Sequence, residues 1–247
     1  MTLPKHSIDI NSITLRFGIG CFETLKINEK GLICFLHEHL ERLKLGIKTC
    51  NLNCPSDQEI NTQLTEFINK QNLQKQKNYI LRLIFTAEYG LDLSLNEYIE
   101  NKNPSKLTIS QNWFINSKCN LNKFKSFNYL KNHLAYQEAV NSGFDDAILL
   151  NEKGEICETT RANLFFCDYN ENWFTPALES GCLPGIIRKS LINSLKAQEV
   201  KIMSADLQKF QLALMSNSLI ESRNIEYINE IKFEISSEKF FAYKESN

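Results

Sequence analysis

Two side chains in this sequence could together perform chemistry on a bound aldehyde. Lys125 lies on an expected extended segment and Glu158 on an expected hairpin, with a helix between them. A lysine that loses its proton can attack a carbonyl carbon, and a carboxylate held at a fixed distance can tune an attached ring. These are the groups needed to attach an aldehyde cofactor such as pyridoxal phosphate. The residue types permit that chemistry without demanding it.

The elements around this pair follow from hydrophobic periodicity. Residues 130–142 predict a helix that Gly143 ends, and residues 147–150 and 155–158 predict two strands joined by a turn. Further strands are expected at 163–167, 173–175, 200–203 and 212–216, with an amphipathic helix after Pro184-Gly185. The exposed N–H groups of a helix start can hold an anion, but a loop-then-helix entry is common.

The first part of the chain predicts a mixture of strands and helices. Residues 13–27 predict a strand, a bend at Gly18 and Gly20, and a second strand, for which residues 32–36 form the hairpin partner. A helix follows with Leu36, Leu40, Leu43 and Ile47 on one stripe. Arg42 lies off that stripe, so periodicity alone places it on a solvated face.

The middle of the chain predicts a domain boundary. Ser56 and Glu59 form a capping box that opens a helix, and strands are expected at 79–86 and 107–113. The polar residues 88–105 between those strands predict a loop over a site. We expect a first domain over 1–115, a linker at 116–123 and a second domain over 124–247.

Composition narrows the class of protein. A formal charge of -1 excludes a bulk attraction to nucleic acid or to an anionic membrane. No segment has the length and apolarity of a signal peptide or a membrane span, so we expect a cytoplasmic protein. The eight cysteines form no C-x-x-C motif and are expected as small core residues, and four scattered histidines give little support to a metal site, so none is predicted.

Six segments in order resemble the class IV aminotransferases, which include branched-chain and D-amino-acid aminotransferases and aminodeoxychorismate lyases. FGIGCFETLKI resembles the family's YGDGVFET strand pair, HEHLERL resembles EEHLxRL, and KSFNYL resembles KSLNLL or KTLNYL. GEICETTRANLFF resembles GxVTEGSxSNLFF, ESGCLPGIIR resembles SGILPGITR, and LMSNSLIE resembles the family's strand ending in Thr or Ser. The resemblance covers about residues 17–225.

This resemblance assigns roles that residue types left open. It implies that Lys125 bonds pyridoxal 5′-phosphate and that Glu158 faces the cofactor's pyridine nitrogen, keeping it protonated. It implies a phosphate site and nearby contacts, made by Arg42, the N–H groups of Ile186 and Ile187, the Ser218 hydroxyl and, beside the ring hydroxyl, Tyr129. Phe22 is a candidate substrate contact.

The sequence also departs from the family pattern. Ile19 stands where the family usually has Asp, and TAEYG at 86–90 replaces a loop whose arginine often meets a substrate carboxylate. Arg161 occupies a place usually held by a small residue. Our hypothesis is that Arg161 partly supplies the missing positive charge, and an ordinary surface hairpin arginine is the alternative.

The resemblance implies a two-domain α/β (α+β) fold, with a smaller N-terminal α/β domain, a larger C-terminal barrel-like domain, and the cofactor between them. It favours a lyase that converts 4-amino-4-deoxychorismate into p-aminobenzoate and pyruvate in folate biosynthesis. The alternatives are a branched-chain or D-amino-acid transaminase and a binding protein that has lost catalysis. Family members are commonly homodimers that act on small molecules, and the same is expected here, with no nucleic-acid or membrane partner.

Overall fold

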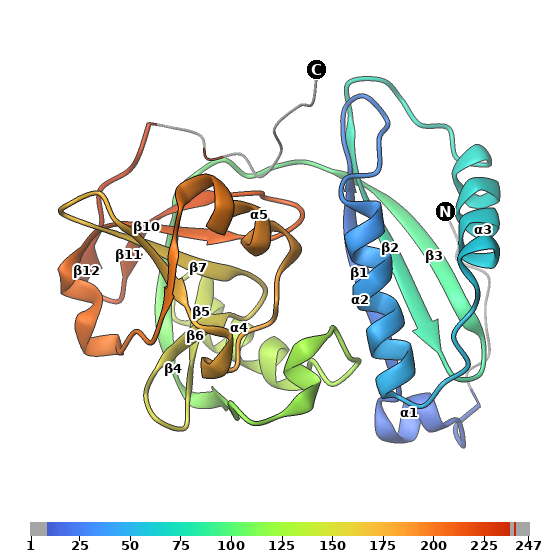
Figure 1. The fold of residues 1–247 in the computed structure, drawn as a ribbon, viewed down its shortest axis with the longest axis horizontal. Coiled ribbons are helices and arrows are strands. Elements are labelled where there is room, and N and C mark those ends of the chain that lie inside the picture. Colours follow the sequence, from blue (N-terminus) through green and yellow to red (C-terminus); the bar gives the residue numbers. More distant parts are fainter. Residues whose placement is uncertain (1–8, 238–239, 241–247) are drawn as a thin grey trace. The chain divides into compact units, whose positions relative to one another are not determined.

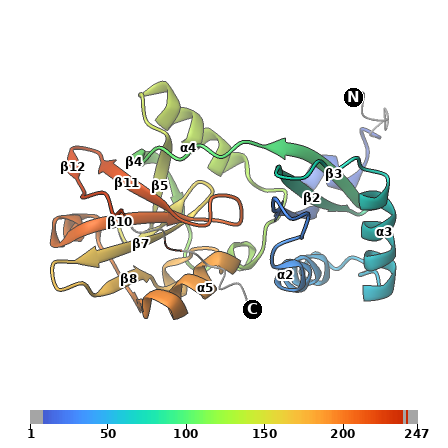
Figure 2. The same ribbon diagram turned by 90° about the horizontal axis from the view of Figure 1, so that it is seen from above.

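The computed structural model describes residues 9–237 and residue 240, and the chain forms two compact units. The first unit extends to Tyr98 and also includes Phe124–Asn128. The second unit comprises Ile99–Lys123 and the chain from Tyr129 onward. Figures 1 and 2 show the elements of each unit.

The first unit is a three-stranded antiparallel sheet with helices on one face (Figure 2). Its order is β1-β2-β3, and every residue of β1 pairs with β2. Apolar side chains of the sheet and of helices α2 and α3 form its core. The elements are α1 (Ile13–Phe17), β1 (Gly20–Ile27), α2 (Leu36–Thr49), α3 (Asp57–Asn69), β2 (Asn78–Thr86) and β3 (Gly90–Tyr98).

The second unit is built on a mixed nine-stranded sheet in the order β6-β5-β4-β11-β10-β7-β8-β9, with β12 paired to β11. Its strands are β4 (Ser105–Ile115), β5 (Asp146–Asn151), β6 (Ile156–Thr159), β7 (Asn163–Asp168), β8 (Trp173–Pro176), β9 (Gln198–Val200), β10 (Phe210–Ser216), β11 (Arg223–Ile228) and β12 (Ile231–Lys232). Its helices are η1 (Asn120–Lys123), α4 (Leu130–Asn141), η2 (Leu178–Ser180), α5 (Ile186–Leu195) and η3 (Ser204–Lys209).

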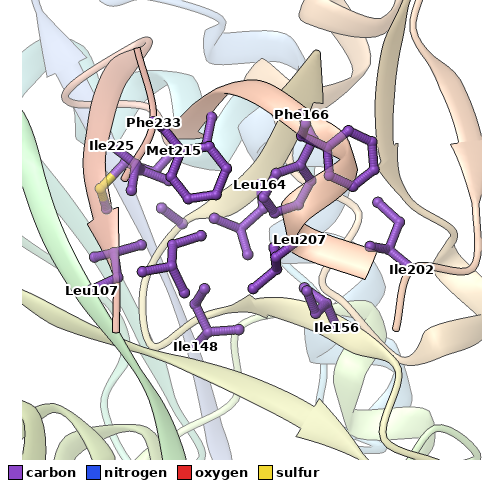
Figure 3. Close-up of a cluster of buried hydrophobic side chains, with 14 of the residues drawn as sticks. Leu107, Ile148, Ile156, Leu164, Phe166, Ile202, Leu207, Met215, Ile225 and Phe233 are labelled. Atoms are coloured by element: carbon purple, nitrogen blue, oxygen red, sulfur yellow. The ribbon is translucent and has the colours of Figure 1, made fainter. Parts of the chain in front are cut away.

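The large sheet is curled around its own hydrophobic core. Ile156 on the terminal strand β6 packs in the same buried cluster as Leu164 on β7 and Met215 on β10, although these strands are far apart in the sheet order. Figure 3 shows these side chains converging in one interior. A flat sheet could not bring them together, so burial of these apolar groups produces a half-barrel. Helix α4 packs outside it, through Ala135 and Ala139.

Four elements differ from the sequence-based expectations. The strand expected at 200–203 lies earlier, as β9 over Gln198–Val200, and of residues 201–203 only Met203 makes a bridge. The first expected strand is helix α1, because Ser12 caps its start by accepting from Leu15 N and Gly18 ends it at φ 65°. Residues 32–36 form no strand beyond one bridge between Ile27 and Ile33, and helix α2 already begins at Leu36. The expected loop at 88–105 contains β3, whose alternating Leu91, Leu93 and Leu95 pack on the core.

The two units divide the chain differently from the boundary expected at residue 115 and the linker expected at 116–123, because residues 99–123 belong to the second unit. Strand β4 belongs to the second unit because it pairs in parallel with both β5 and β11. Residues 124–128 belong to the first unit because Ser126 bridges to Cys21 and Phe124 is buried in the core of that unit. The chain therefore returns to its first unit at the segment that carries Lys125.

Candidate active site

Lys125 is fixed against strand β1 by backbone pairing. Phe22 N donates to Lys125 O at 2.9 Å, and Phe127 N donates to Gly20 O at 3.1 Å. Lys125 Nζ lies 5.1 Å from the centroid of the Phe22 ring. The candidate nucleophile and the candidate substrate contact Phe22 are therefore side by side, and both depend on β1 for their position.

A buried ionic cluster lies at the junction of β1 and α2. Glu23 Oε1 accepts from Arg42 Nε, and Glu23 Oε2 accepts from Arg42 Nη2, each at 2.7 Å. His39 Nδ1 lies 2.7 Å from Glu23 Oε2. Arg42 is only 8% exposed, so the solvated face expected from periodicity alone is wrong. The helix places His39 and Arg42 on one face because they are three residues apart.

The charges of this cluster shift its pKa values. Burial would raise the pKa of Glu23, but the charge and hydrogen bonds of Arg42, with the hydrogen bond from His39, lower it to about 2. Burial lowers the pKa of His39, with further lowering from Arg42 and Lys125, and the bond to Glu23 only partly opposes this. At neutral pH the carboxylate and guanidinium are therefore charged and the imidazole is neutral.

Glu158 is held on β6 in the second unit by two donors. Its Oε2 accepts from Leu183 N at 3.1 Å and from Asn163 Nδ2 at 3.2 Å. Burial lowers the pKa of Lys131, and the negative charge of Glu158 partly offsets this lowering by raising the pKa of the same amine. These contacts orient a half-buried carboxylate, the kind of group that can accept from a protonated ring nitrogen.

The start of helix α5 is tied to the same carboxylate. Asn163 Nδ2 also donates to Leu183 O at 2.9 Å, just before the N-cap residue Gly185. A Cβ on Gly185 would overlap Asn163 Oδ1, so the close approach requires glycine. Gly185 has no side chain to cap the helix, and the N–H groups of Ile186 and Ile187 open its first turn. This arrangement suits an anion.

Ser218 lies in a turn that Asn217 fixes. Asn217 Oδ1 accepts from Leu219 N at 2.9 Å and from Ile220 N at 3.1 Å. Two residues earlier, Ser216 lies opposite Asn163 in the β10–β7 ladder. Its buried hydroxyl has no hydrogen-bond partner among the described residues. Asn163, Ser216 and the turn that carries Ser218 are therefore neighbours within the second unit.

Tyr129 is the N-cap residue of helix α4. Its carbonyl accepts from His133 N at 2.9 Å, and its side chain is half-buried. Its backbone therefore starts the helix that follows the segment of Lys125, and its contact with a ring hydroxyl stays a prediction.

The Arg161 side chain contacts residues of its own unit. Its Nε donates to Asp146 Oδ2 at 3.3 Å, its Nη2 donates to Asp145 O at 3.0 Å, and its guanidinium carbon lies 4.4 Å from the Tyr136 ring centroid. Asp146 is fully buried and also accepts from Thr160 Oγ1. The structure thus gives Arg161 a role in holding the 159–162 turn, while its contact with substrate stays a hypothesis.

We expect Arg161→Ala to lower the free energy of unfolding by about 1 kcal/mol, because the pair is half-exposed and Asp146 keeps its other donors. Substrate KM should change less than about threefold if the charge serves Asp146 alone. Denaturant unfolding and steady-state kinetics measure the two effects, with Thr160→Val as a purely structural comparison. A KM raised about tenfold or more at unchanged stability would instead support the substrate role.

Comparison with known proteins places these residues in a family. The family model described as Amino-transferase class IV matches residues 20–228, which include every candidate residue above. The chain belongs to the class IV aminotransferase family. Enzymes of this family use pyridoxal 5′-phosphate and act on small molecules.

The relatives of this class IV chain carry two activities in their names. Aminodeoxychorismate lyase of Bacillus subtilis (strain 168) is 25% identical over 240 residues, covering 88% of this chain and 80% of that protein. A probable branched-chain-amino-acid aminotransferase of Synechocystis sp. is 28% identical over 207 residues, covering 75% and 66%. A crystal structure from Legionella pneumophila, provisionally assigned as a 4-amino-4-deoxychorismate lyase, has 27% identity and a TM-score of 0.83, covering 94% and 91%. Its likeness confirms the expected mixed α/β fold with a barrel-like sheet.

The donor groups in each unit fit the family's cofactor. In the second unit, the start of α5 suits a phosphate and Glu158 suits a protonated ring nitrogen. In the first unit, Arg42 supplies a buried cation and Lys125 a primary amine. Three buried polar side-chain atoms have no hydrogen-bond partner among the described residues: His39 Nε2 in the first unit, and Arg188 Nε and Ser216 Oγ in the second.

Sequence reasoning missed three residues that contact candidate site residues or their neighbours: Glu23 and His39 in the first unit, and Asn163 in the second. Each lies inside a motif already quoted, in CFET, HEHLERL and TRAN respectively. An acid two residues after the buried Cys21 on a strand indicates a side chain on the same, core-facing side, where an acid requires a partner. That signal could have identified Glu23.

Three further features of the described residues concern metal-binding groups, membrane-spanning helices and cysteines. No group of three or more His, Cys, Asp or Glu side chains in that part of the chain could hold a metal ion. None of the helices within the described ranges is long and apolar enough to cross a membrane. All eight cysteines are free thiols. The expectation of core residues is confirmed for the four buried ones, Cys21, Cys157, Cys167 and Cys182, whereas the other four are only partly buried.

Proposed function

We propose that this class IV enzyme is a 4-amino-4-deoxychorismate lyase that yields p-aminobenzoate and pyruvate for folate biosynthesis. The observation that carries the proposal is the match to the Bacillus subtilis lyase, which covers 88% of this chain. The match therefore includes both units rather than one shared motif. The Legionella pneumophila structure supports the same choice through its identity of 27% and its TM-score of 0.83.

The charges at two positions favour a lyase over an amino-acid transaminase. The 86–90 turn carries an acid, Glu88, which accepts from Thr14 N at 3.2 Å, in place of an arginine. Arg161 is committed to Asp146. A transaminase must hold two amino-acid and keto-acid carboxylates in turn, whereas the lyase needs no second keto acid.

The cofactor would be held by residues of both units. We assign its carbonyl to Lys125, its pyridine nitrogen to Glu158, and its ring hydroxyl to Tyr129. We assign its phosphate to Arg42, to the Ile186 and Ile187 N–H groups, and to the Ser218 hydroxyl. When bound, pyridoxal 5′-phosphate supplies an electron sink for negative charge on the carbon that bears the substrate's amine.

The chain's own residues then move protons. Lys125 Nζ, as a neutral amine, takes the proton from the substrate carbon that bears the amine. The electron pair released there forms the aromatic ring as the carbon–oxygen bond to the enolpyruvyl group breaks. The enol leaves and gains a proton to become pyruvate, so no net proton is consumed. We assign the return of that proton to Lys125, whose Nζ lies 5.1 Å from the centroid of the Phe22 ring.

The deciding assay supplies aminodeoxychorismate with no keto acid and follows p-aminobenzoate. The lyase predicts sustained product, with one pyruvate per p-aminobenzoate. Turnover that requires 2-oxoglutarate and a branched-chain amino acid would instead establish the second candidate, which the Synechocystis relative favours. Failure of both assays would overturn both proposals.

We expect Glu158→Gln to reduce turnover by roughly 10- to 100-fold, the equivalent of one charge-assisted hydrogen bond. The amide keeps an acceptor for Leu183 N but carries no charge to hold a protonated ring nitrogen. Steady-state kinetics at saturating cofactor measures the loss.

Glu155→Gln is the matched comparison on the same hairpin. Glu155 is also held by two donors, Asn151 and Ser180, but is assigned no cofactor contact. This variant should lose stability and keep its turnover per folded molecule. If Glu158→Gln retained full turnover, its assignment to the ring would be wrong.

The assembly and the location belong to the same proposal. We propose a homodimer in the cytoplasm, on the resemblance to class IV enzymes alone. Sedimentation equilibrium should give twice the chain mass, and a mass equal to that of one chain would contradict the dimer.

A further inference from the structure

His39 stands out among the buried groups because the proposed chemistry does not use it. His39 lies on α2 and is fully buried, and its Nδ1 lies 2.7 Å from Oε2 of Glu23 on β1. Glu23 also binds Arg42 through both oxygens. The Glu23 carboxylate therefore positions both the His39 and the Arg42 side chain.

The hydrogen bonds define the state of the imidazole. An ionised carboxylate only accepts hydrogen bonds, so Nδ1 carries the proton and donates to Glu23. A neutral His39 then has a lone pair on Nε2. That atom is buried and has no partner among the described residues. A buried acceptor without a donor is unfavourable, so Nε2 is available to take a proton or to accept a hydrogen bond.

The net charge of the cluster indicates what that change is. The ionisable groups that act on His39 are Glu23 from β1, Arg42 from its own helix, and Lys125 from the 124–128 segment. Glu23 and Arg42 cancel one another. The guanidinium assigned to the cofactor's phosphate therefore shares its charge with a carboxylate 2.7 Å away. A phosphate with about two negative charges needs more positive charge than this pair offers.

We propose that His39 takes up a proton on Nε2 when the phosphate of the cofactor binds to the Arg42 cluster. The imidazolium then donates from both nitrogens, keeps its bond to Glu23, and adds one positive charge to the cluster. This inference rests on the assignment of Arg42 to phosphate within the proposed function. It does not depend on which reaction the enzyme catalyses.

The test measures proton uptake on binding. Pyridoxine 5′-phosphate is the probe, because it has the ring and phosphate but no aldehyde to react with Lys125. Calorimetric titrations near neutral pH, in buffers of different ionisation enthalpy, give the protons bound per ligand. His39→Asn keeps a donor for Glu23 but cannot titrate, and His37→Asn is the matched control on the exposed face of the same helix.

The wild type and His37→Asn are expected to take up about one proton more per ligand than His39→Asn. Between the lowered pKa of the free imidazole and the pKa of the bound one, their affinity should fall by up to tenfold per pH unit, and the His39→Asn affinity should fall less steeply. Equal proton uptake in all three proteins would overturn the inference.

A second measurement needs no variant. The sequence has only four histidines, so side-chain 15N NMR of the wild type can follow each one. The His39 Nε2 signal should change from a bare to a protonated nitrogen on addition of the probe, and an unchanged signal would contradict the proposal. Proton uptake without lyase turnover would leave this inference intact and overturn the proposed reaction. Failure of the wild type to bind the probe would overturn the phosphate site and this inference together.

Discussion

Lys125→Ala is expected to lower turnover by at least about 10³-fold, because one amine both attaches the cofactor and moves the substrate proton. The fold should survive the change, since the bonds that fix this segment to β1 are made by backbone atoms of Lys125 and Phe127. Lys125→Arg should be equally inactive, because a guanidinium keeps the charge but cannot act as the nucleophile. Product formation under saturating cofactor measures both variants.

Two neighbouring lysines provide the controls. Lys123 is exposed, two residues before Lys125, and Lys123→Ala should retain wild-type turnover. Lys131 is electrostatically coupled to Glu158, so it is the alternative amine in the second unit. Activity retained in Lys125→Ala but lost in Lys131→Ala would show that the resemblance assigned the wrong lysine.

Glu23→Gln is expected to reduce the free energy of unfolding by about 3–5 kcal/mol, or to prevent folding at 37 °C. The change leaves the Arg42 charge buried without its carboxylate, and an uncompensated buried charge is strongly unfavourable. His39 also loses the anion that holds its Nδ1. Urea unfolding of the purified variant measures the change.

An exposed ion pair in the same sheet offers the matched control. Lys77 Nζ and Glu97 Oε2 are 2.9 Å apart, but the two side chains are 38% and 46% exposed. Glu97→Gln should therefore change stability by less than about 1 kcal/mol. Adding Arg42→Met to Glu23→Gln should recover part of the loss, because neither charge then remains buried. A Glu23→Gln effect as small as that of Glu97→Gln would show that the cluster is not a stabilising pair.

The acid sensitivity of the protein follows from the same carboxylate. The pKa of Glu23 is about 2 in the folded chain and 4.5 in its ordinary state. Its contribution is therefore fully present above pH 4.5 and is lost as the pH falls towards 2. The stability of the wild type should decline across that window more steeply than that of Glu23→Gln. Parallel declines would contradict this origin.

Much of the fold was predictable because local patterns and tertiary packing agree. The capping box at Ser56 and Glu59 forms as expected, and the apolar stripe at Leu40, Leu43 and Ile47 faces the core. The turn that follows β5 and the helix that Gly143 follows also form where their residues predict. In each case the residue types and the final burial favour the same structure.

The remaining differences arise where long-range pairing decides. The local sequence favours a hairpin between β1 and residues 32–36, but β1 pairs along its whole length with the more distant strand β2. Arg42 lies off the apolar stripe of its helix, and only the approach of Glu23 from β1 explains its burial. Likewise, the partner of Arg161 is Asp146 on another strand, which no spacing rule identifies. Charged residues that pair across the fold are thus the hardest to place from sequence, because their positions depend on a partner elsewhere in the chain.

The most direct test of the account is to find which atom of the protein bonds the cofactor. The protein would be incubated with pyridoxal 5′-phosphate, reduced with borohydride to make the attachment permanent, and digested for mass spectrometry. We expect one modified site, on the peptide that carries Lys125, and a yellow protein before reduction. A label on Lys131 or another lysine, or a protein that stays colourless and unlabelled with excess cofactor, would contradict it.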